Sequence, residues 1–491
     1  MKKENIVLIK GTVDWTQIQD AVQNAVVQVF AQVGKFNWLE PYNIEEQAEN
    51  RGSGFLINGD GYIITNAHVI DEAKRIWVHV PLLGRHMIHV DVVGCCPQRD
   101  VALLRIKPKD LKELRAALGV VPYLIFGDSD VVQRTDAILV LGYPMGQYRL
   151  KSTTGVVSGR ESSDGGQAFI QVTAPINPGS SGGPMFNEHG QVIGISIATI
   201  AEAQNVGYAI PINQLSLILD ELYTQRLVRV PFLGVQCMYA NDSKAEFLGN
   251  PLPAGIYINR VIKDSLFDRA GIQVGDMLYE FNGLPIDVYG ESPAPWGVDK
   301  TTLIDLIARV KTGDKVKCVV YRNGKRKEIT LKFVLSDPYP IRHMYPDCEA
   351  IDYEIIAGMV IMPLADNHIP LLIEDAPDLV VYEKVEEKLQ PVLVIAHVLP
   401  GSLAQQLNVI MPGDSIKEVN GIEVGTLESF RKALQKSITT GFLTLKTRRD
   451  FFAAFNLQDL LDDELQLSKD FMYPVTKAVE KLLKKVNKTA V

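Results

Sequence analysis

The chain has few cysteines and no long apolar run. Its 491 residues include only 5 cysteines, an odd number, and no two of them form a C-x-x-C pair for a metal or redox site. We therefore expect the cysteines to be small, buried apolar residues. No apolar run approaches the roughly 20 residues that a membrane-spanning helix needs, so we expect no membrane span.

An excess of basic charge is also missing. Lys and Arg number 50 against 58 Asp and Glu, which gives a net charge of −8. A protein that binds nucleic acid without sequence preference is more often basic, so we expect no nucleic-acid partner. Hydrophobic residues make up 46% and charged residues 22%, which argues against disorder. The length predicts roughly three or four domains.

The N-terminus contains only a short apolar patch. Basic residues flank four apolar residues, 6–9, which are too few for the apolar region of a secretory signal peptide. Two interpretations stay open. The soluble protein stays in the cytoplasm, or a signal peptide was removed before this numbering begins and the protein works in the periplasm or cell envelope.

A turn rich in Gly and Pro, Asn177–Pro184, contains two serines and is followed by an apolar strand, Val192–Ile197. Glycine adopts positive φ without a Cβ clash, so such a turn can fold tightly. It can also direct successive N–H groups at one point, which is what an oxyanion requires. Taken alone, a plain surface turn between two strands explains this stretch equally well.

Two upstream segments supply partners for a serine nucleophile. His68 lies in a small-residue turn after an apolar strand, and Asp100 begins the apolar strand Val101–Ile106. A serine hydroxyl needs a base that titrates near neutrality, and histidine has an ordinary pKa of about 6.5. A carboxylate then fixes the imidazole tautomer. The chain order His68, Asp100, Ser181 is one of those in which this triad recurs.

These three segments resemble the trypsin-like proteases of the HtrA/Do (Deg) family, and the wider layout is similar to its plant Do-like 9 branch. The resemblance runs from near residue 52 to near residue 422. It implies that Ser181 attacks the scissile carbonyl, that His68 takes its proton and that Asp100 orients His68. The oxyanion hole implied comprises Gly179, Ser180 and Ser181. Ser180 replaces the more usual Asn, and the Ser-Gly-Gly-Pro match favours Ser181 as the nucleophile.

Short strands broken by Gly, Pro, Asn and Asp run from residue 52 to about 215, the pattern of an all-β barrel or sandwich. The resemblance implies a mainly β chain: a trypsin-like double β-barrel, two PDZ-like α+β domains and a helical C-terminal tail. The predicted boundaries are 1–50 (N-terminal segment and loop), 51–225 (protease), 230–340 (first PDZ), 345–450 (second PDZ-like domain) and 451–491 (helical extension).

The two PDZ-like domains are visible as an internal repeat. A strand, a short helix, a Gly-Asp turn, a strand and an Asn-Gly hairpin occur in 261–283 and again in 398–421. PDZ domains add a peptide to a sheet edge and hold its carboxylate in a backbone loop. We expect the first domain to bind C-terminal peptides through this loop, although a plain strand start also fits; the matching residues are Phe232, Leu233, Gly234 and Val235. In the second domain, residues 356–359 match this loop, but an insertion, 365–390, follows them. We therefore expect that the second groove does not bind peptide as the first does and that this domain serves assembly.

The residues around the Gly turn predict the substrate preference. No Asp or Glu precedes the turn where the pocket base is expected, and the next strand ends in small and apolar residues. We expect a pocket for small aliphatic side chains, although plain barrel core also explains these residues: Ile176, Ile197 and Ala198.

The function expected is therefore ATP-independent cleavage of unfolded proteins in protein quality control, without a metal or organic cofactor. The resemblance also implies a homo-oligomer, a trimer or a multiple of three. Two alternatives remain: a proteolytically silent peptide-binding scaffold or chaperone, and a non-proteolytic esterase.

Overall fold

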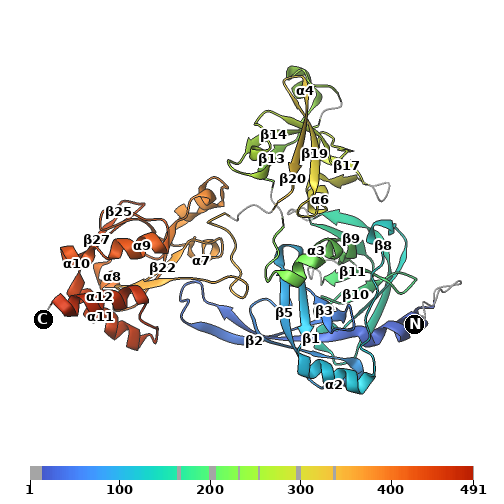
Figure 1. Cartoon of the computed structure of the whole chain (residues 1–491), viewed down its shortest axis with the longest axis horizontal. Helices are drawn as coiled ribbons and strands as arrows, with labels where there is room; N and C mark the ends of the chain where they lie inside the picture. The colour runs from blue at the N-terminus through green and yellow to red at the C-terminus, as the bar shows by residue number, and fades with distance from the viewer. Residues whose placement is uncertain are drawn as a thin grey trace. The chain divides into compact units, whose positions relative to one another are not determined.

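The computed structural model describes residues 14–162, 167–197, 206–230, 233–252, 255–294, 300–334 and 339–489. The chain forms two compact units. The first comprises Met1–Val33 and Ala48–Ser336, and the second comprises Gly34–Gln47 and Asp337–Val491. Figure 1 labels the elements and colours them from the N- to the C-terminus.

Six strands of the first unit close into a barrel in the order β1-β2-β3-β6-β5-β4. They are β1 (Val26–Phe36), β2 (Ile44–Leu56), β3 (Tyr62–Thr65), β4 (Ala73–His79), β5 (Ile88–Cys96) and β6 (Val101–Ile106). Residues 58–61, an Asn-Gly-Asp-Gly turn, connect β2 to β3, as this turn chemistry favours. Because β1 begins at Val26 and belongs to the barrel, the barrel begins before residue 51, at which the protease domain was predicted to start.

A second closed barrel follows, with strand order β10-β11-β12-β9-β8-β7. Its strands are β7 (Ala137–Gly142), β8 (Lys151–Ser162), β9 (Ala168–Val172), β10 (Pro184–Phe186), β11 (Val192–Ile197) and β12 (Gly207–Pro211). Alternate apolar residues of these strands, such as Ile138 and Val140, pack into its core because side chains alternate across a strand. The predicted double barrel is confirmed.

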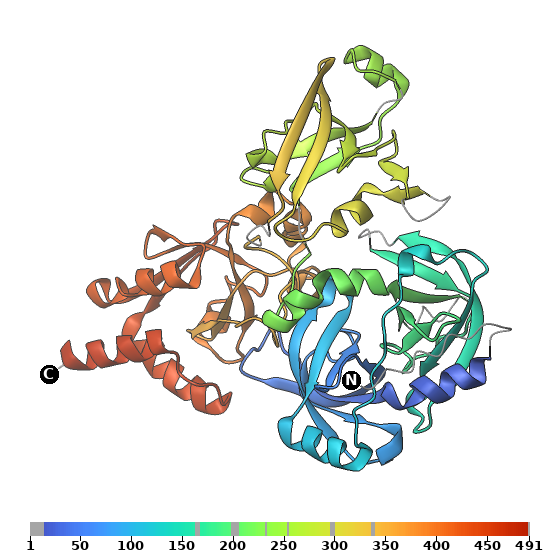
Figure 2. The ribbon, with the colours of Figure 1, turned by 45° about the vertical axis from the view of Figure 1, so that its right-hand side comes forward.

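Three helices accompany the barrels: α1 (Trp15–Val22), α2 (Pro108–Leu118) and α3 (Ile212–Thr224). The side chain of Asp14 accepts backbone N–H groups at the start of α1. Helix α3 contacts strands of both barrels, and Figure 2 shows it running along them. Its apolar face, including Leu215 and Leu222, is buried, so α3 holds the two barrels together.

The rest of the first unit is a PDZ domain. Its sheet has the order β13-β14-β15-β19-β20, with β16 paired to β15 and a separate hairpin, β17-β18. The strands are β13 (Val235–Met238), β14 (Ile256–Val261), β15 (Met277–Phe281), β16 (Leu284–Pro285), β17 (Glu291–Pro293), β18 (Lys300–Thr302), β19 (Lys315–Arg322) and β20 (Lys325–Lys332). The helices are α4 (Asp242–Phe247), α5 (Leu266–Arg269) and α6 (Leu303–Ala308).

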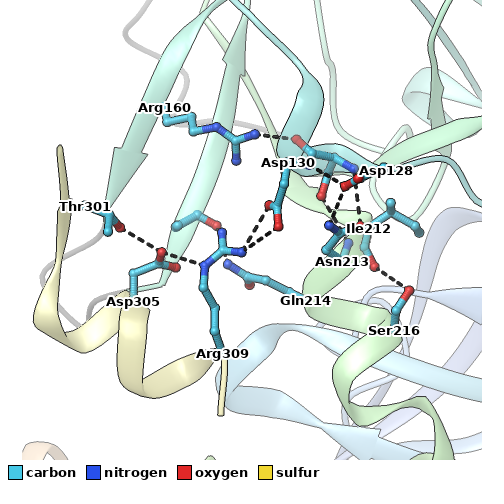
Figure 3. A network of polar contacts seen from close by, with 12 residues as sticks. Asp128, Asp130, Arg160, Ile212, Asn213, Gln214, Ser216, Thr301, Asp305 and Arg309 are labelled. Atoms are coloured by element: carbon cyan, nitrogen blue, oxygen red, sulfur yellow. Dashed lines mark hydrogen bonds and ion pairs between the residues drawn. The ribbon is translucent and has the colours of Figure 1, made fainter. Parts of the chain in front are cut away.

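Polar contacts join this PDZ domain to the protease domain. Arg309, directly after α6, binds Asp305 through Nε at 2.9 Å and Asp130 through Nη1 at 3.0 Å (Figure 3). Arg99 of the protease domain donates an Nη2 hydrogen bond to the carbonyl of Ala308 at 2.5 Å. The end of α6 is therefore attached to the residue that precedes Asp100.

The second unit is built around a seven-stranded sheet with the order β21-β22-β23-β24-β26-β27 and β25 paired to β24. The strands are β21 (Glu354–Ile356), β22 (Met359–Pro363), β23 (Leu393–Val398), β24 (Ser415–Val419), β25 (Ile422–Glu423), β26 (Phe442–Thr447) and β27 (Phe452–Asn456). The helices are α7 (Ile369–Leu372), α8 (Leu403–Leu407), α9 (Leu427–Leu434), α10 (Ser437–Thr440), α11 (Leu457–Asp470) and α12 (Lys477–Thr489). The predicted helical C-terminal tail comprises α11 and α12.

Residues 34–47, from the tip of the β1–β2 hairpin, belong to this second unit. Trp38 is buried in an apolar cluster with Ile355 and Tyr473, and its ring meets that of His368 edge to face at 5.1 Å. Burial lowers the pKa of His368 to about 4, so the ring is neutral. Trp38, which lies within the predicted N-terminal segment and loop, is thus part of a domain core.

Within the described part of the chain, no helix is long and apolar enough to cross a membrane. No disulfide bond is present among the described residues, and Cys95, Cys96 and Cys318 are buried.

Candidate active site

His68 and Asp100 form a closely bonded pair. Asp100 follows a short 3-10 turn, Pro97–Arg99, and adopts the left-handed conformation with φ 53°. Its Oδ2 lies 2.8 Å from Nδ1 of His68, and its Oδ1 accepts the backbone N–H of His68 at 2.9 Å. Asn66 donates its side-chain amide to the carbonyl of Asp100 at 2.8 Å. The carboxylate is thereby held at two points of the same histidine.

The pKa of His68 is raised above its ordinary value. Burial acts to lower the pKa, but the hydrogen bond and the charge of Asp100 together outweigh it. The His68 side chain is 50% exposed and that of Asp100 20%. The imidazole can therefore be reached from solvent while its Nδ1 side is bonded to the carboxylate, which leaves Nε2 for a reacting group.

The turn that carries Ser181 contacts the end of β3, just before His68. Ser181 is 3% exposed, and its carbonyl accepts the N–H of Ser53 at 2.7 Å. Gly182 has φ 86°, and a Cβ on it would lie 2.1 Å from the carbonyl oxygen of Ser53 and 3.1 Å from the backbone nitrogen of Asn66. Only glycine permits so close an approach. The two barrels thus bring the predicted serine turn against the predicted histidine turn.

The turn at 177–180 has the geometry of a type II β-turn. The N–H of Ser180 donates to the carbonyl of Asn177 at 2.9 Å, and Gly179, at the third position, has φ 93°. The carbonyl of Pro178 accepts the N–H of Met145 at 2.6 Å. Because a trans peptide directs its C=O and N–H to opposite sides, the N–H of Gly179 points away from Met145. That N–H has no acceptor among the residues that the structure describes.

Two buried serines that the sequence analysis missed support this turn. The hydroxyl of Ser53 donates to the carbonyl of Gly179 at 2.8 Å and accepts the N–H of Tyr143 at 2.9 Å. The hydroxyl of Ser196 donates to the carbonyl of Ser180 at 2.7 Å. Ser196 could have been found, because it is a polar residue inside the apolar run of β11. Ser53 lies in a Gly-Ser-Gly stretch and carries no such signal.

The predicted pocket residues have different surroundings. Ile176 is buried in the core of the second barrel, and Ile197, at the end of β11, is half-buried. A Cβ on Gly207 would lie 2.9 Å from Cδ1 of Ile176, so the Ile176 side chain packs against the backbone of β12 at this glycine. Ala198 lies outside the described residues.

The predicted carboxylate loop of the first PDZ domain precedes β13. Leu233 is buried, Gly234 has φ 79°, and Val235 begins the strand. A Cβ on Gly234 would lie 2.0 Å from Cβ of Ser265, so glycine is required here. Phe232 lies outside the described residues.

Comparison with protein families matches three segments of the chain. Residues 52–195 match the trypsin-like peptidase domain, and residues 231–333 and 343–476 match PDZ domains.

Two curated relatives illustrate the similarity along most of the chain. A "probable periplasmic serine endoprotease DegP-like" from Marinomonas sp. (strain MWYL1) is 32% identical over 404 residues, which are 80% of this chain and 76% of that protein. A protein of the same description from Pseudomonas putida (strain W619) is 30% identical over 424 residues, 84% of this chain and 81% of that protein.

Solved structures agree with these relatives. The HtrA-type protease AlgW with a tripeptide has a TM-score of 0.52 and 26% identity, and the match covers 66% of this chain and 98% of AlgW. AlgW with a decapeptide has a TM-score of 0.50 at the same identity and covers 66% of this chain and 100% of that one.

Proposed function

The chain belongs to the DegP-like HtrA family of serine endoproteases with PDZ domains, and on this premise we propose that it degrades unfolded proteins without ATP. The observation that carries this proposal is the His68–Asp100 pair, held by two hydrogen bonds beside the Ser181 turn. The hydrolysis itself needs no nucleotide, because it is thermodynamically favourable and the acyl-enzyme intermediate lowers its barrier by dividing it into two easier steps.

The mechanism assigns one role to each residue. Ser181 Oγ attacks the scissile carbonyl while His68 Nε2 accepts the hydroxyl proton, and Asp100 stabilises the resulting imidazolium. The N–H groups of Gly179 and Ser181 stabilise the tetrahedral oxyanion. The intermediate then collapses, His68 protonates the leaving amine, and an acyl-Ser181 ester remains. Water, deprotonated by His68, hydrolyses this ester and regenerates the free hydroxyl.

We also propose that the oxyanion turn is ordered before substrate binds. The support is that the Gly179 N–H points away from Met145, because the Pro178 carbonyl accepts the N–H of Met145, and that the Ser53 hydroxyl donates to the Gly179 carbonyl. Removing one donor from such a hole costs roughly 3 to 4 kcal/mol of transition-state stabilisation, so its geometry controls the rate.

The proposed preference is for small aliphatic residues before the cut bond. Ile176 and Ile197 are uncharged, and neither residue directly before the turn, Pro175 or Ile176, is acidic and able to pair with Lys or Arg of a substrate. A panel of peptides that differ only at this residue tests the preference. Faster cleavage after Lys or Arg than after Val or Ala would contradict it.

For the first PDZ domain we propose capture of C-terminal peptides at the edge of β13, with Leu233 and Gly234 amides holding the carboxylate. The AlgW structures with a tripeptide and a decapeptide support the idea that relatives take up peptides. We further propose a homo-oligomer built from trimers and a location in the periplasm or cell envelope. The description of the curated relatives as periplasmic supports that location.

A fluorophosphonate probe tests the central assignment. It reacts with an activated serine, and mapping the modified residue separates Ser181 from Ser180. We expect labelling at Ser181, loss of labelling and of casein degradation in Ser181→Ala, and no change in Ser158→Ala, an exposed serine of β8. An unlabelled parent protein that binds peptide would instead favour the silent scaffold.

A further inference from the structure

The second PDZ-like domain has a carboxylate loop with the same geometry as the first. In the first domain Gly234 has φ 79° and its carbonyl accepts the N–H of Ile262 at 2.8 Å. In the second, Gly358 has φ 78° and its carbonyl accepts the N–H of Leu399, also at 2.8 Å. Ala357-Gly358 is therefore the structural counterpart of Leu233-Gly234.

Matching serines confirm this correspondence. Ser265 caps α5, and Ser402 caps α8. A Cβ on Gly234 would lie 2.0 Å from Cβ of Ser265, and a Cβ on Gly358 would lie 2.1 Å from Cβ of Ser402. The strand after each loop, β13 or β22, is accordingly the strand to which a PDZ domain adds its peptide.

The outer edges of these two strands differ. Strand β13 ends the sheet of the first domain, whereas β22 has β21 on its outer side. Glu354 pairs with Ile361 and Ile356 with Met359 in an antiparallel register. Because β23 pairs with the other side of β22, β21 occupies the edge at which a peptide would pair. In the first domain the segment before the loop is bonded elsewhere: the backbone N–H of Val230 donates to the side chain of Gln98 in the protease domain.

Helix α9, the counterpart of α6, holds β21 in this place. Arg431 of α9 binds Glu354 through Nε at 2.7 Å, and its Nη1 and Nη2 bind Asp352 at 2.7 and 2.8 Å. Nη2 also donates to the carbonyl of Tyr353 at 3.0 Å. Residues 352–354 therefore lie between β22 and α9, which are the two walls of a PDZ groove.

A carboxylate of the chain also faces the loop itself. Glu464 of α11 is fully buried, and its Oε1 accepts the hydroxyl of Tyr473 at 2.7 Å. The backbone N–H of Ala357 is near enough to favour the ionised carboxylate, while Oε2 has no hydrogen-bond partner among the described residues. Leu467, one turn further along α11, would be 3.5 Å from a Cβ on Gly358. Helix α11 thus covers the place where a peptide terminus would bind.

We propose that the groove of the second PDZ-like domain is filled by the chain itself, with β21 in place of the peptide strand and Glu464 in place of its terminal carboxylate. The internal ligand makes this domain a closed module that captures no peptide. Among the residues that the structure describes, the edge of β13 is then the one PDZ edge open to a peptide. Helix α11, the first of the two C-terminal helices, thus blocks this binding site.

Hydrogen exchange of the full chain with Ser181→Ala, which prevents cleavage, tests this proposal. The probe is a pool of decapeptides with free C-termini. We expect exchange in residues 354–363 to be unchanged by the pool, because no edge of β22 is open. Slower exchange in 354–363 on adding the pool to the otherwise unchanged protein would overturn the proposal.

A variant that opens the groove provides the positive control. Arg431→Ala releases β21 and Glu464→Ala uncovers the loop, so together they should let the pool slow exchange in β22 roughly tenfold or more, since an added strand forms several backbone hydrogen bonds. The matched control, Lys432→Ala with Asp462→Ala, changes exposed neighbours on the same two helices and should behave like the parent. Unchanged exchange in β24 and β26 shows that both variants remain folded. An opened, folded variant that binds no peptide would also overturn the proposal.

Discussion

Replacement of Asp100 by Asn tests the assignment of the site most directly. The carboxylate accepts two hydrogen bonds from one residue, at the backbone N–H and at Nδ1 of His68. An asparagine side chain has one acceptor atom and one donor group, so it cannot accept both. If its oxygen keeps the backbone N–H, its NH₂ group faces Nδ1 and places the ring proton on Nε2. That tautomer cannot take a proton from Ser181.

The expected loss follows from this tautomer. We expect kcat to fall by about 10⁴, which corresponds to about 5 kcal/mol of transition-state stabilisation. The pH profile should change as well. Because Asp100 raises the pKa of His68, the parent loses activity as the pH falls through a value above 6.5. In Asp100→Asn this acid limb should move to lower pH.

The chain contains a matched control for this experiment. Asp110 binds His89 in the same way, accepting its backbone N–H at 2.6 Å and lying 2.9 Å from its Nδ1, but the pair lies on β5 and α2, away from the Ser181 turn. Asp110→Asn should leave cleavage of a fluorogenic peptide unchanged. A fall of less than tenfold in Asp100→Asn, or equal falls in both variants, would refute the reasoning.

Three further predictions concern the surroundings of the site and the other domains. Ser53→Ala should lower kcat about 5- to 30-fold with little change in KM, because two hydrogen bonds worth about 1 kcal/mol each are lost from the oxyanion turn. An unchanged kcat in steady-state assays would contradict this prediction. Burial raises the pKa of Glu464 to about 7, and the negative charges of Asp463 and Glu354 raise it further. The hydrogen bonds from Tyr473 and from the Ala357 N–H act in the opposite direction. Folding therefore favours the protonated form of Glu464, so the stability that this group contributes below pH 4.5 should be lost as the pH rises to about 7. Urea unfolding between pH 5 and 8 should show a smaller decline in the free energy of unfolding for Glu464→Gln than for the parent. Equal declines in the two proteins would exclude this role. Arg309→Ala and Asp130→Ala should show a coupling of about 1 kcal/mol in a double-mutant cycle of unfolding, because the pair is mostly buried; additive effects would show that it does not stabilise the domain contact.

Patterns along the chain predicted short β-strands and an internal repeat, and the resemblance carried by the three motifs implied the double barrel, the PDZ domains and the family. Alternating strands, turn residues at fixed places and a repeat of about twenty residues are local signals, and each reports a local backbone preference. His68 and Asp100 could be named because each follows or begins an apolar strand. The structure places them within hydrogen-bond distance, and their catalytic roles, with that of Ser181, stay predictions until the variants are measured.

Contacts between distant segments could not be read in this way. Ser53 bonds Gly179, 126 residues further on, and nothing near Ser53 indicates this partner. Trp38 looked like a loop residue until the fold buried it beside His368. The sequence did raise the question of whether the second PDZ groove binds peptide, from the insertion after its loop.

The amino-acid order alone determined which elements form and which chemical groups are available, because both depend on neighbours along the chain. Only the tertiary structure decided that Arg431 of α9 binds Glu354 of β21 and that Glu464 reaches the loop at Ala357. Those outcomes depend on strand register and helix packing, which bring together groups about a hundred residues apart. A short sequence window contains no information on such long-range contacts, since the free energy that selects them comes from burial of the whole domain core.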